Sequence, residues 1–245
     1  MLHPLLSLLA PLSCAGCFRP DIALCSRCLA RLHTPLARPS IAVATALWGV
    51  PVISGGAYRG ARRRVVSAIK DGGVRRLTAA LVSQAMIREL AELGQRHPGL
   101  VLVPVPPSAK GFFLRGFWPT ELIARALSRG AGGFPVLRSL SPGHLVLGDL
   151  LAGFRHTPRP RTKRLSRRWA HVGVRGMPGA SQVVLVDDVM VSGATLEACA
   201  RALRRKGHSI LAVYVVAHVP EPQRSPVPRA GGQVYSERTT LTRRT

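Results

Sequence analysis

A run of thirteen residues, from Val183 to Thr195, constrains this chain more than any other part of its sequence. Its first four residues are branched aliphatics, which is typical of a strand buried on both faces of a parallel sheet. Two carboxylates, Asp187 and Asp188, follow, and a short turn of small residues then leads into the periodic pattern of a helix. The run therefore predicts a strand, a turn and a helix, with both carboxylates at the carboxyl end of the strand.

This position favours a ligand that carries hydroxyls and a phosphate. Open α/β sheets bind ligands at the carboxyl ends of their strands, and the amino terminus of the following helix favours a phosphate. Two adjacent carboxylates can accept hydrogen bonds from a vicinal diol or hold the hydration shell of a magnesium ion. The turn offers the hydroxyls of Ser192 and Thr195 and several backbone N–H groups, which suit a phosphomonoester.

Three alternatives compete with a site for a diol and a phosphate. A buried strand can also end in an Asp-rich turn whose carboxylates only cap the next helix, and this alternative stays open. A P-loop is a poor rival because no Gly-Lys-Ser/Thr sequence follows the strand. A dinucleotide-binding fingerprint fails because its three spaced glycines are missing.

Four cysteines near the amino terminus form two CxxC pairs separated by seven residues. Four thiolates at this spacing suit a tetrahedral zinc site in which each pair supplies one knuckle. Disulfides or free thiols are the alternative, but we expect a cytoplasmic protein, whose thiols are normally reduced, and this favours a metal. The fifth cysteine, Cys199, falls in the helix after the turn, where we expect it to act as a small buried hydrophobe. The four candidate metal ligands are Cys14, Cys17, Cys25 and Cys28.

The segment from Met1 to Leu12 is apolar, but no Lys or Arg precedes it, as one would in a secretory signal. It is also too short to span a bilayer. Secretion stays open as an alternative, and we expect the segment to form an apolar flap near the zinc knuckle. No other stretch is long and apolar enough for membrane insertion, which we therefore do not expect.

The chain is strongly basic, with 35 Lys and Arg against 11 Asp and Glu and a formal net charge of +24. Such a charge attracts an anionic partner, whether a phosphorylated substrate, a nucleic acid or a ribosome. Most of the cations are arginines, and genomic base bias also produces compositions rich in Arg, Ala and Gly. Charge alone therefore does not single out nucleic acid.

Hydrophobic periodicity predicts alternating strands and helices, and hence a parallel sheet flanked by helices. At 245 residues and 47% hydrophobic content, the chain can bury one sizeable α/β domain and a small appendage. Strands are expected just before Ala57 and at residues 100–105, 181–186 and 210–217. Helices are expected at residues 62–70, 77–93, 121–128 and 195–206. We divide the chain into a zinc-finger segment with its connection (1–45), an α/β domain (46–219) and a disordered basic tail (220–245).

Taken together, the two motifs resemble those of the ComF family, the competence-protein-F-like phosphoribosyltransferase homologues of bacteria. That family combines a four-cysteine zinc finger with a type I phosphoribosyltransferase domain, and the run at 183–195 resembles the phosphoribosyl pyrophosphate (PRPP) signature of that fold. The similarity covers roughly residues 12 to 219. Further matches are Tyr58-Arg59-Gly60, Ile69-Lys70 with Gly72, Val103-Pro104-Val105-Pro106 and Arg115-Gly116-Phe117.

The resemblance implies a protein that binds PRPP with magnesium and transfers the phosphoribosyl group to an acceptor, with both the acceptor and turnover itself left open. Asp187 and Asp188 would bind the ribose hydroxyls. The 5-phosphate would be held by the turn of Val191, Ser192, Gly193, Ala194 and Thr195. Val191 departs from the Thr that many members carry, which removes one hydroxyl but keeps a backbone N–H.

The pyrophosphate that leaves PRPP carries several negative charges, which magnesium and basic side chains must neutralise. Candidates to contact it are Pro106, in the turn after a strand, together with Arg115 and Lys70. For each of these two cations, a solvated surface position is an equal alternative. The family usually continues Arg-Gly-Phe with Asn-Gln, whereas this chain has Trp118-Pro119 and so lacks that amide pair.

A basic segment at residues 155–168 is the candidate mobile loop of such an enzyme. Lys163 and Arg164 would close over the site from this loop and exclude water during the transfer. A solvated charged loop is the alternative for any single cation in it.

A different class of function is a non-catalytic accessory protein in DNA uptake during natural competence. Its zinc knuckle and basic surface would bind single-stranded DNA or a helicase partner. A basic track leading away from Asp187 and Asp188 would favour this function, whereas cations gathered around them would favour pyrophosphate. A purely structural zinc module would explain the cysteines but would leave the run at 183–195 without a cause.

Overall fold

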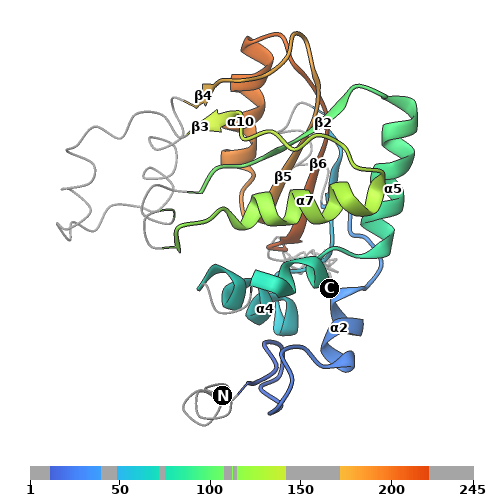
Figure 1. Ribbon diagram of the computed structural model, residues 1–245, viewed down its shortest axis with the longest axis vertical. Coiled ribbons are helices and arrows are strands. Elements are labelled where there is room, and N and C mark those ends of the chain that lie inside the picture. Colours follow the sequence, from blue (N-terminus) through green and yellow to red (C-terminus); the bar gives the residue numbers. More distant parts are fainter. Residues whose placement is uncertain are drawn as a thin grey trace, which may run out of the picture.

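A computed structural model describes residues 12–39, 49–71, 75–107, 112, 115–141 and 172–220. A four-stranded parallel sheet lies at its centre (Figure 1). Its strands are paired in the order β1-β6-β5-β2. Its strands are β1 (Val52–Ser54), β2 (Leu100–Pro104), β5 (Gln182–Met190) and β6 (Ser209–His218). Two short strands, β3 (Leu140–Ser141) and β4 (Gly173–Val174), pair antiparallel in a separate ribbon.

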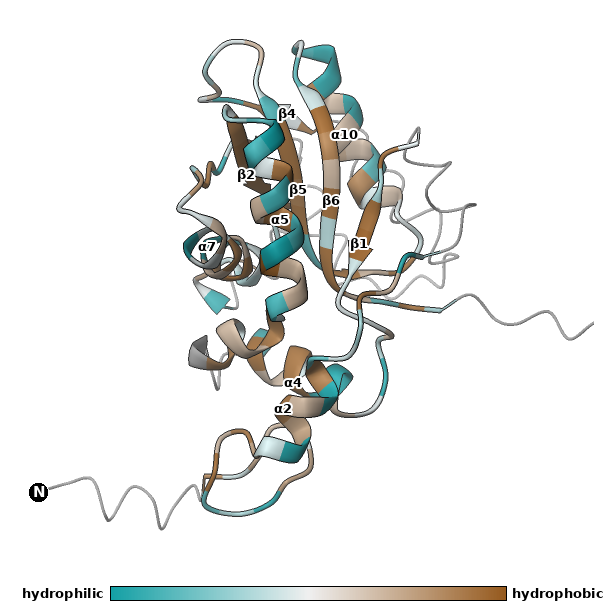
Figure 2. Cartoon of the chain, turned by 90° about the vertical axis from the view of Figure 1, so that its right-hand side faces the viewer, coloured by the Kyte–Doolittle hydropathy of each residue, from teal (hydrophilic) through white to brown (hydrophobic). Residues whose placement is uncertain are grey.

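Helices cover both faces of the sheet. The helices α5 (Gln84–Arg96) and α7 (Pro119–Ala131) pack on one face, and α10 (Ala194–Arg205) packs on the other. Figure 2 shows the apolar strands between these two helical layers. Two further helices, α2 (Ser26–Leu32) and α4 (Gly60–Lys70), lie beyond one end of the strands (Figures 1 and 2). The sequence-based expectation of a parallel sheet flanked by helices is confirmed.

The aliphatic run of β5 is fully buried because it packs against helices on both faces. Val184 and Val186 belong to the core layer under α5 and α7, whereas Val183 and Leu185 belong to the layer under α10. All four side chains have an exposed fraction of 0%. Burial of each such side chain contributes about 1.5–3 kcal/mol to folding, so β5, like β6, stabilises both layers.

The helix expected at residues 77–93 is instead two elements, and this part of the prediction is wrong. A 3-10 helix, η1 (Arg75–Leu81), comes first, and α5 begins only at Gln84. Ser83 separates them: its side chain accepts a hydrogen bond from the backbone N–H of Met86 and so caps α5. An apolar periodicity that runs through both elements hides this cap in the sequence.

A second difference lies directly after the last cysteine pair, where α2 occupies part of the stretch that the sequence indicated as a connection. The other expected strands and helices are present with ends shifted by a few residues. In the described part of the chain, no helix is both long and apolar enough to cross a membrane. The expected apolar flap up to residue 11, the candidate loop with Lys163 and Arg164, and the expected tail beyond residue 220 lie outside the described residues.

Candidate functional site

Asp187 and Asp188 lie near the carboxyl end of β5, in the middle of the sheet edge. Asp187 is paired in register with Val215 of β6 on one side. On the other side, the backbone N–H of Val105 donates to the Val186 carbonyl at 2.9 Å and joins the chain after β2 to β5 just before the carboxylates. The acidic pair therefore lies where the sequence predicted, at the edge at which open parallel sheets bind their ligands.

The two carboxylates differ in their surroundings. The Asp188 backbone N–H donates to Oδ1 of Asp187 at 2.8 Å. Burial and the adjacent charge of Asp188 together raise the pKa of Asp187 to about 8, against smaller opposing effects of that N–H and of Lys70. Near neutral pH, Asp187 can therefore exist as a carboxylic acid that donates a hydrogen bond as well as accepting one.

Lys70, the last residue of α4, forms an ion pair with Asp188. Its Nζ lies 2.8 Å from Oδ1 of Asp188, and the side chains are 32% and 14% exposed. Burial lowers the pKa of Lys70, but the Asp188 carboxylate outweighs this effect, and the net pKa is raised. Lys70 is thus part of the site. The sequence predicted that it contacts the pyrophosphate, but in the described residues it pairs with Asp188, the residue predicted to bind the ribose hydroxyls.

The turn after β5 leads directly into the amino terminus of α10. Gly193 has a φ of 72°, in the left-handed region that glycine adopts without strain, and it occupies the N-cap position of α10. It offers no side-chain cap, so the first N–H groups of α10 are available to an anion. Within the described residues, neither Asp187 nor Asp188 bonds to these N–H groups, which disfavours the alternative of carboxylates that only cap the helix.

The side chains of this turn differ in how much they contribute to an anion site. Val191 is 67% exposed, so its side chain packs against little, and its backbone N–H is the group it can offer to an anion. Leu196, in the first turn of α10, is 1% exposed and anchors the helix on the sheet. The structure thus brings together the carboxylates and the turn of residues 191–195 at one strand end, as the sequence predicted.

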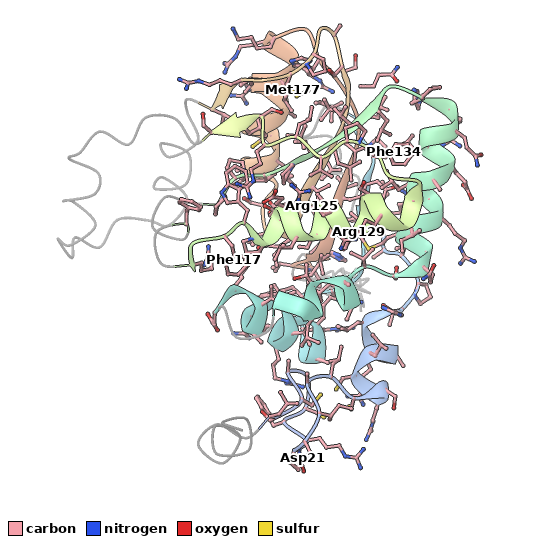
Figure 3. The ribbon with its side chains drawn as sticks, viewed as in Figure 1. Asp21, Phe117, Arg125, Arg129, Phe134 and Met177 are labelled. Atoms are coloured by element: carbon pink, nitrogen blue, oxygen red, sulfur yellow. The ribbon has the colours of Figure 1, made fainter. Side chains whose placement is uncertain are left out.

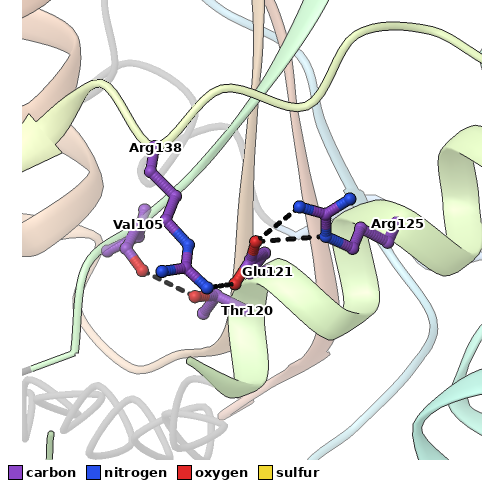
Figure 4. A network of polar contacts seen from close by, with 5 residues as sticks. All are labelled: Val105, Thr120, Glu121, Arg125 and Arg138. Carbon is purple, nitrogen blue, oxygen red and sulfur yellow. Dashed lines mark hydrogen bonds and ion pairs between the residues drawn. The ribbon is translucent and has the colours of Figure 1, made fainter. Parts of the chain in front are cut away.

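The candidate pyrophosphate turn follows β2. Pro106 is buried, and residues 108–111 of the turn lie outside the described part. The Thr120 hydroxyl donates to the Val105 carbonyl at 2.7 Å and fixes the start of α7 to the end of β2 (Figure 4). Nε of Arg115 is buried and has no hydrogen-bond partner among the described residues, so this group is one that an anion would satisfy.

A buried glutamate binds two arginines at the start of α7, and the sequence analysis missed most of these contacts. The Glu121 side chain is 6% exposed and binds Arg125 at 2.9 Å and also Arg138 (Figure 4). Burial raises the pKa of Glu121, but the two guanidiniums outweigh it and lower the pKa overall. The Arg138 guanidinium also lies over the Trp118 ring, 5.4 Å from its centroid. The spacing of Glu121 and Arg125 on one helix face was a usable signal, but nothing in the sequence points to Arg138.

The four cysteines of the CxxC pairs form one cluster. Their sulfur atoms lie within 4.8 Å of one another, and the Cys17 and Cys25 sulfurs are 3.7 Å apart. Four sulfurs bound to one zinc ion at ~2.3 Å are about 3.8 Å apart, so the cluster fits a tetrahedral metal site. None of these cysteines forms a disulfide, and Cys199 is fully buried in α10, away from the cluster.

Backbone N–H groups of this cluster favour the ionised form of one thiol, which is the form that binds a metal. The Cys25 N–H donates to the Cys14 sulfur at 3.3 Å. Burial opposes ionisation of Cys14, but such backbone N–H bonds lower its pKa to about 6, whereas burial and the neighbouring thiols raise the pKa of Cys28 to about 12. A Cβ at Gly16 would lie 2.6 Å from the Cys28 sulfur, so the first knuckle requires glycine there.

The cysteine cluster is attached to α4. Ala61 packs against it, and Nε of Arg64 donates to the Gly16 carbonyl at 2.6 Å. Arg62 is 4% exposed and donates to the Leu32 carbonyl at the end of α2 (2.7 Å) and to the Val216 carbonyl of β6 (3.3 Å). Nothing in the sequence indicates that this one arginine among so many is buried.

No family model and no curated protein matches the chain. Solved structures to which it is similar include a purine phosphoribosyltransferase from Pyrococcus horikoshii, at 19% identity and a TM-score of 0.29, over 55% of this chain and 80% of that one. A hypoxanthine phosphoribosyltransferase from Staphylococcus aureus has 15% identity and a TM-score of 0.31, over 56% of this chain and 73% of that one. The protein TT1426 from Thermus thermophilus has 19% identity and a TM-score of 0.31, over 60% and 84%. Similarities this remote say nothing about the activity of this chain.

Proposed function

We propose that the protein is a ComF-like phosphoribosyltransferase that binds PRPP with magnesium and transfers its phosphoribosyl group to an acceptor. The junction of β5 and α10 is the part of the structure that best supports this function. Two adjacent carboxylates, Asp187 and Asp188, lie near the carboxyl end of β5, and the short turn after this strand leads into a helix whose first N–H groups have no side-chain cap. A sugar diol with a phosphate one short chain away fits this order of groups.

The chain's residues then have distinct tasks. Asp187 and Asp188 accept hydrogen bonds from the ribose hydroxyls, and the turn at residues 191–195 holds the 5-phosphate with its N–H groups and hydroxyls. The pyrophosphate lies toward the end of β2, where Pro106 shapes the turn and the unpartnered Nε of Arg115 can donate to it. Magnesium, when bound with PRPP, would supply positive charge that offsets part of the negative charge of the pyrophosphate.

Calorimetric titration with PRPP, with and without magnesium, tests this proposal. The wild type should bind in a magnesium-dependent manner, and the double variant D187N/D188N should lose at least about tenfold in affinity, which corresponds to ~1.4 kcal/mol. The control is Asp21→Asn, because Asp21 is a carboxylate of the cysteine knuckle (Figure 3), outside the candidate PRPP site, and asparagine tolerates its positive φ of 61°. Unchanged affinity of the double variant would contradict the ribose assignment.

We propose zinc as the metal of the four-cysteine cluster, in a structural role. Four thiolates with no open position for a substrate are typical of structural zinc. The contacts from Arg64 and Ala61 explain how a bound ion would order the knuckle against α4.

A second candidate function is binding of single-stranded DNA at the knuckle. Phe18 is 68% exposed, with a positive φ of 64°, and the Arg64 guanidinium lies 5.9 Å from its ring centroid. An exposed aromatic ring among cations is a platform on which bases stack, and Arg19 and Arg27 are exposed on the same knuckle. Phe18→Ser should weaken DNA binding and leave PRPP affinity unchanged, and D187N/D188N should do the reverse. Binding to DNA that is insensitive to both Phe18→Ser and salt would count against this candidate.

A further inference from the structure

The order of the strands fixes the side from which an acceptor approaches, given the proposed function on which this inference rests. In a displacement at the anomeric carbon, the nucleophile enters on the face opposite to the leaving group. The sheet order is β1-β6-β5-β2, and two of the pyrophosphate candidates, Pro106 and Arg115, follow β2 on one side of β5. The acceptor then approaches from the opposite side, over the carboxyl ends of β6 and β1.

His218 occupies that position. It is the last residue of β6 and is paired in register with Met190, two residues after Asp188. The next N–H, of Val219, donates to the Met190 carbonyl at 2.8 Å. The backbone of His218 is held on its other side as well, because its N–H donates to the Gly56 carbonyl at 3.0 Å and its carbonyl accepts from Tyr58 N–H at 2.7 Å. The imidazole therefore has a fixed base beside the end of β5.

Ser54, the last residue of β1, contacts the imidazole. The Ser54 hydroxyl is fully buried and lies 2.9 Å from Nδ1 of His218. It donates to the Gly56 carbonyl at 3.3 Å and accepts from the Gly56 N–H at 3.1 Å. With its own proton on the Gly56 carbonyl, the hydroxyl has one lone pair left, which can accept the proton of Nδ1. In that tautomer, Nε2 keeps its lone pair.

Burial and a nearby cation favour the neutral form of the His218 ring. Burial lowers its pKa, and the charge of Arg62 lowers it further, against a smaller opposing effect of a hydrogen bond with the Gly56 backbone. Arg62 comes from α4, and from the same helix Lys70 is occupied by Asp188. From β1, the uncharged Ser54 contacts the ring. A neutral imidazole with a free nitrogen can accept a proton near neutral pH.

We propose that His218 is the general base of the transfer and that Ser54 is the positioning residue that fixes its tautomer. The acceptor is then a nitrogen nucleophile that carries an N–H, such as the ring nitrogen of a heteroaromatic base. The proton of the acceptor passes to Nε2 of His218, and the electron pair that the N–H bond leaves on nitrogen forms the bond to the anomeric carbon. The bond from that carbon to the pyrophosphate oxygen breaks, and pyrophosphate leaves with the electron pair of the broken bond.

The tautomer is tested first, in the whole protein and without any acceptor. Nitrogen-15 NMR of the histidine side chains should show His218 protonated on Nδ1 and bare on Nε2 at neutral pH. Ser54→Ala should shift the ring toward the tautomer protonated on Nε2. A wild-type ring that carries its proton on Nε2, or that is an imidazolium at neutral pH, would overturn the base assignment.

Turnover is tested second, as pyrophosphate release from PRPP in the presence of adenine, guanine, hypoxanthine or uracil. His218→Gln should lower kcat by about 100-fold or more with PRPP affinity within about twofold of wild type, and Ser54→Ala should lower kcat by about tenfold. The acid limb of the wild-type pH profile should vanish in His218→Gln. Full turnover by His218→Gln overturns the inference alone, and no turnover with any base while PRPP binds overturns the acceptor class. Failure of the wild type to bind PRPP overturns the proposed function itself.

Discussion

The ammonium of Lys70 lies 2.8 Å from a carboxylate oxygen of Asp188, and this ion pair joins the end of α4 to the end of β5. The first turns of the same helix contact the cysteine cluster through Ala61 and Arg64. The helical rise of ~1.5 Å per residue separates Ala61 from Lys70 by about 13 Å. One short helix therefore holds both the cysteine knuckle and the candidate PRPP site.

Replacing Lys70 by methionine removes the counter-ion of Asp188 but keeps much of the apolar stem. Because the pair is only partly exposed, we expect a loss of about 1 kcal/mol in the free energy of unfolding. Lys70→Arg keeps the charge and should lose less. Urea unfolding of the three proteins checks this, and equal stability of Lys70→Met and wild type would show that the ion pair contributes nothing.

Asp187 should make stability fall as pH rises. Its carboxyl has an ordinary pKa of 3.8, which the fold raises to about 8, so between these values the unfolded chain ionises more readily than the folded one. The free energy of unfolding therefore falls progressively as pH rises from about 4 to about 8. Asp187→Asn lacks this titration, and its stability relative to wild type should increase over the same interval. Chemical unfolding at several pH values measures the difference, and a difference that does not change with pH would refute the raised pKa.

Gly16→Ala should weaken metal binding without removing a ligand. The new Cβ would lie 2.6 Å from the Cys28 sulfur, so that sulfur or the knuckle must move. Gly99→Ala is the matched control, because no atom lies within 4 Å of a Cβ built there. Zinc content after dialysis against a competing chelator should fall in Gly16→Ala and stay at the wild-type level in Gly99→Ala. Equal retention in both variants would argue against a metal held in this geometry.

Glu121→Gln should destabilise the start of α7, because two guanidiniums lose their shared carboxylate. We expect a cost of about 1–2 kcal/mol, below that of a fully buried pair since Arg125 and Arg138 are 54% and 55% exposed. Glu197→Gln, in the more exposed pair with Arg201, should cost less than about 0.5 kcal/mol. Thermal unfolding compares the two variants, and a larger effect at Glu197 would reverse the expected order.

The junction of β5 and α10 and the cysteine pairs were predictable because each carries its own local signal. Four aliphatics, two carboxylates and Gly193 follow one another in the chain, and the CxxC spacing is likewise local. The split at Ser83 was hidden, since a capping serine inside an apolar periodic stretch looks like any other polar residue.

Contacts between distant segments could not be predicted, because periodicity does not give the order of the strands. Ser54 and His218 lie 164 residues apart in the chain and meet only because β1 pairs with β6. The same holds for Lys70 with Asp188, and for Arg62, whose burial depends on α4 lying against the end of β6. The sequence identified the groups of the candidate site but not which of them bind one another.

A crystal structure of the protein with PRPP and magnesium would show where each group of the ligand binds. We predict the 5-phosphate within hydrogen-bond distance of the backbone N–H groups of residues 193–195, the ribose hydroxyls on Asp187 and Asp188, and the pyrophosphate toward the end of β2. A ligand bound at the cysteine knuckle, or one whose phosphate avoids the turn after β5, would contradict this prediction.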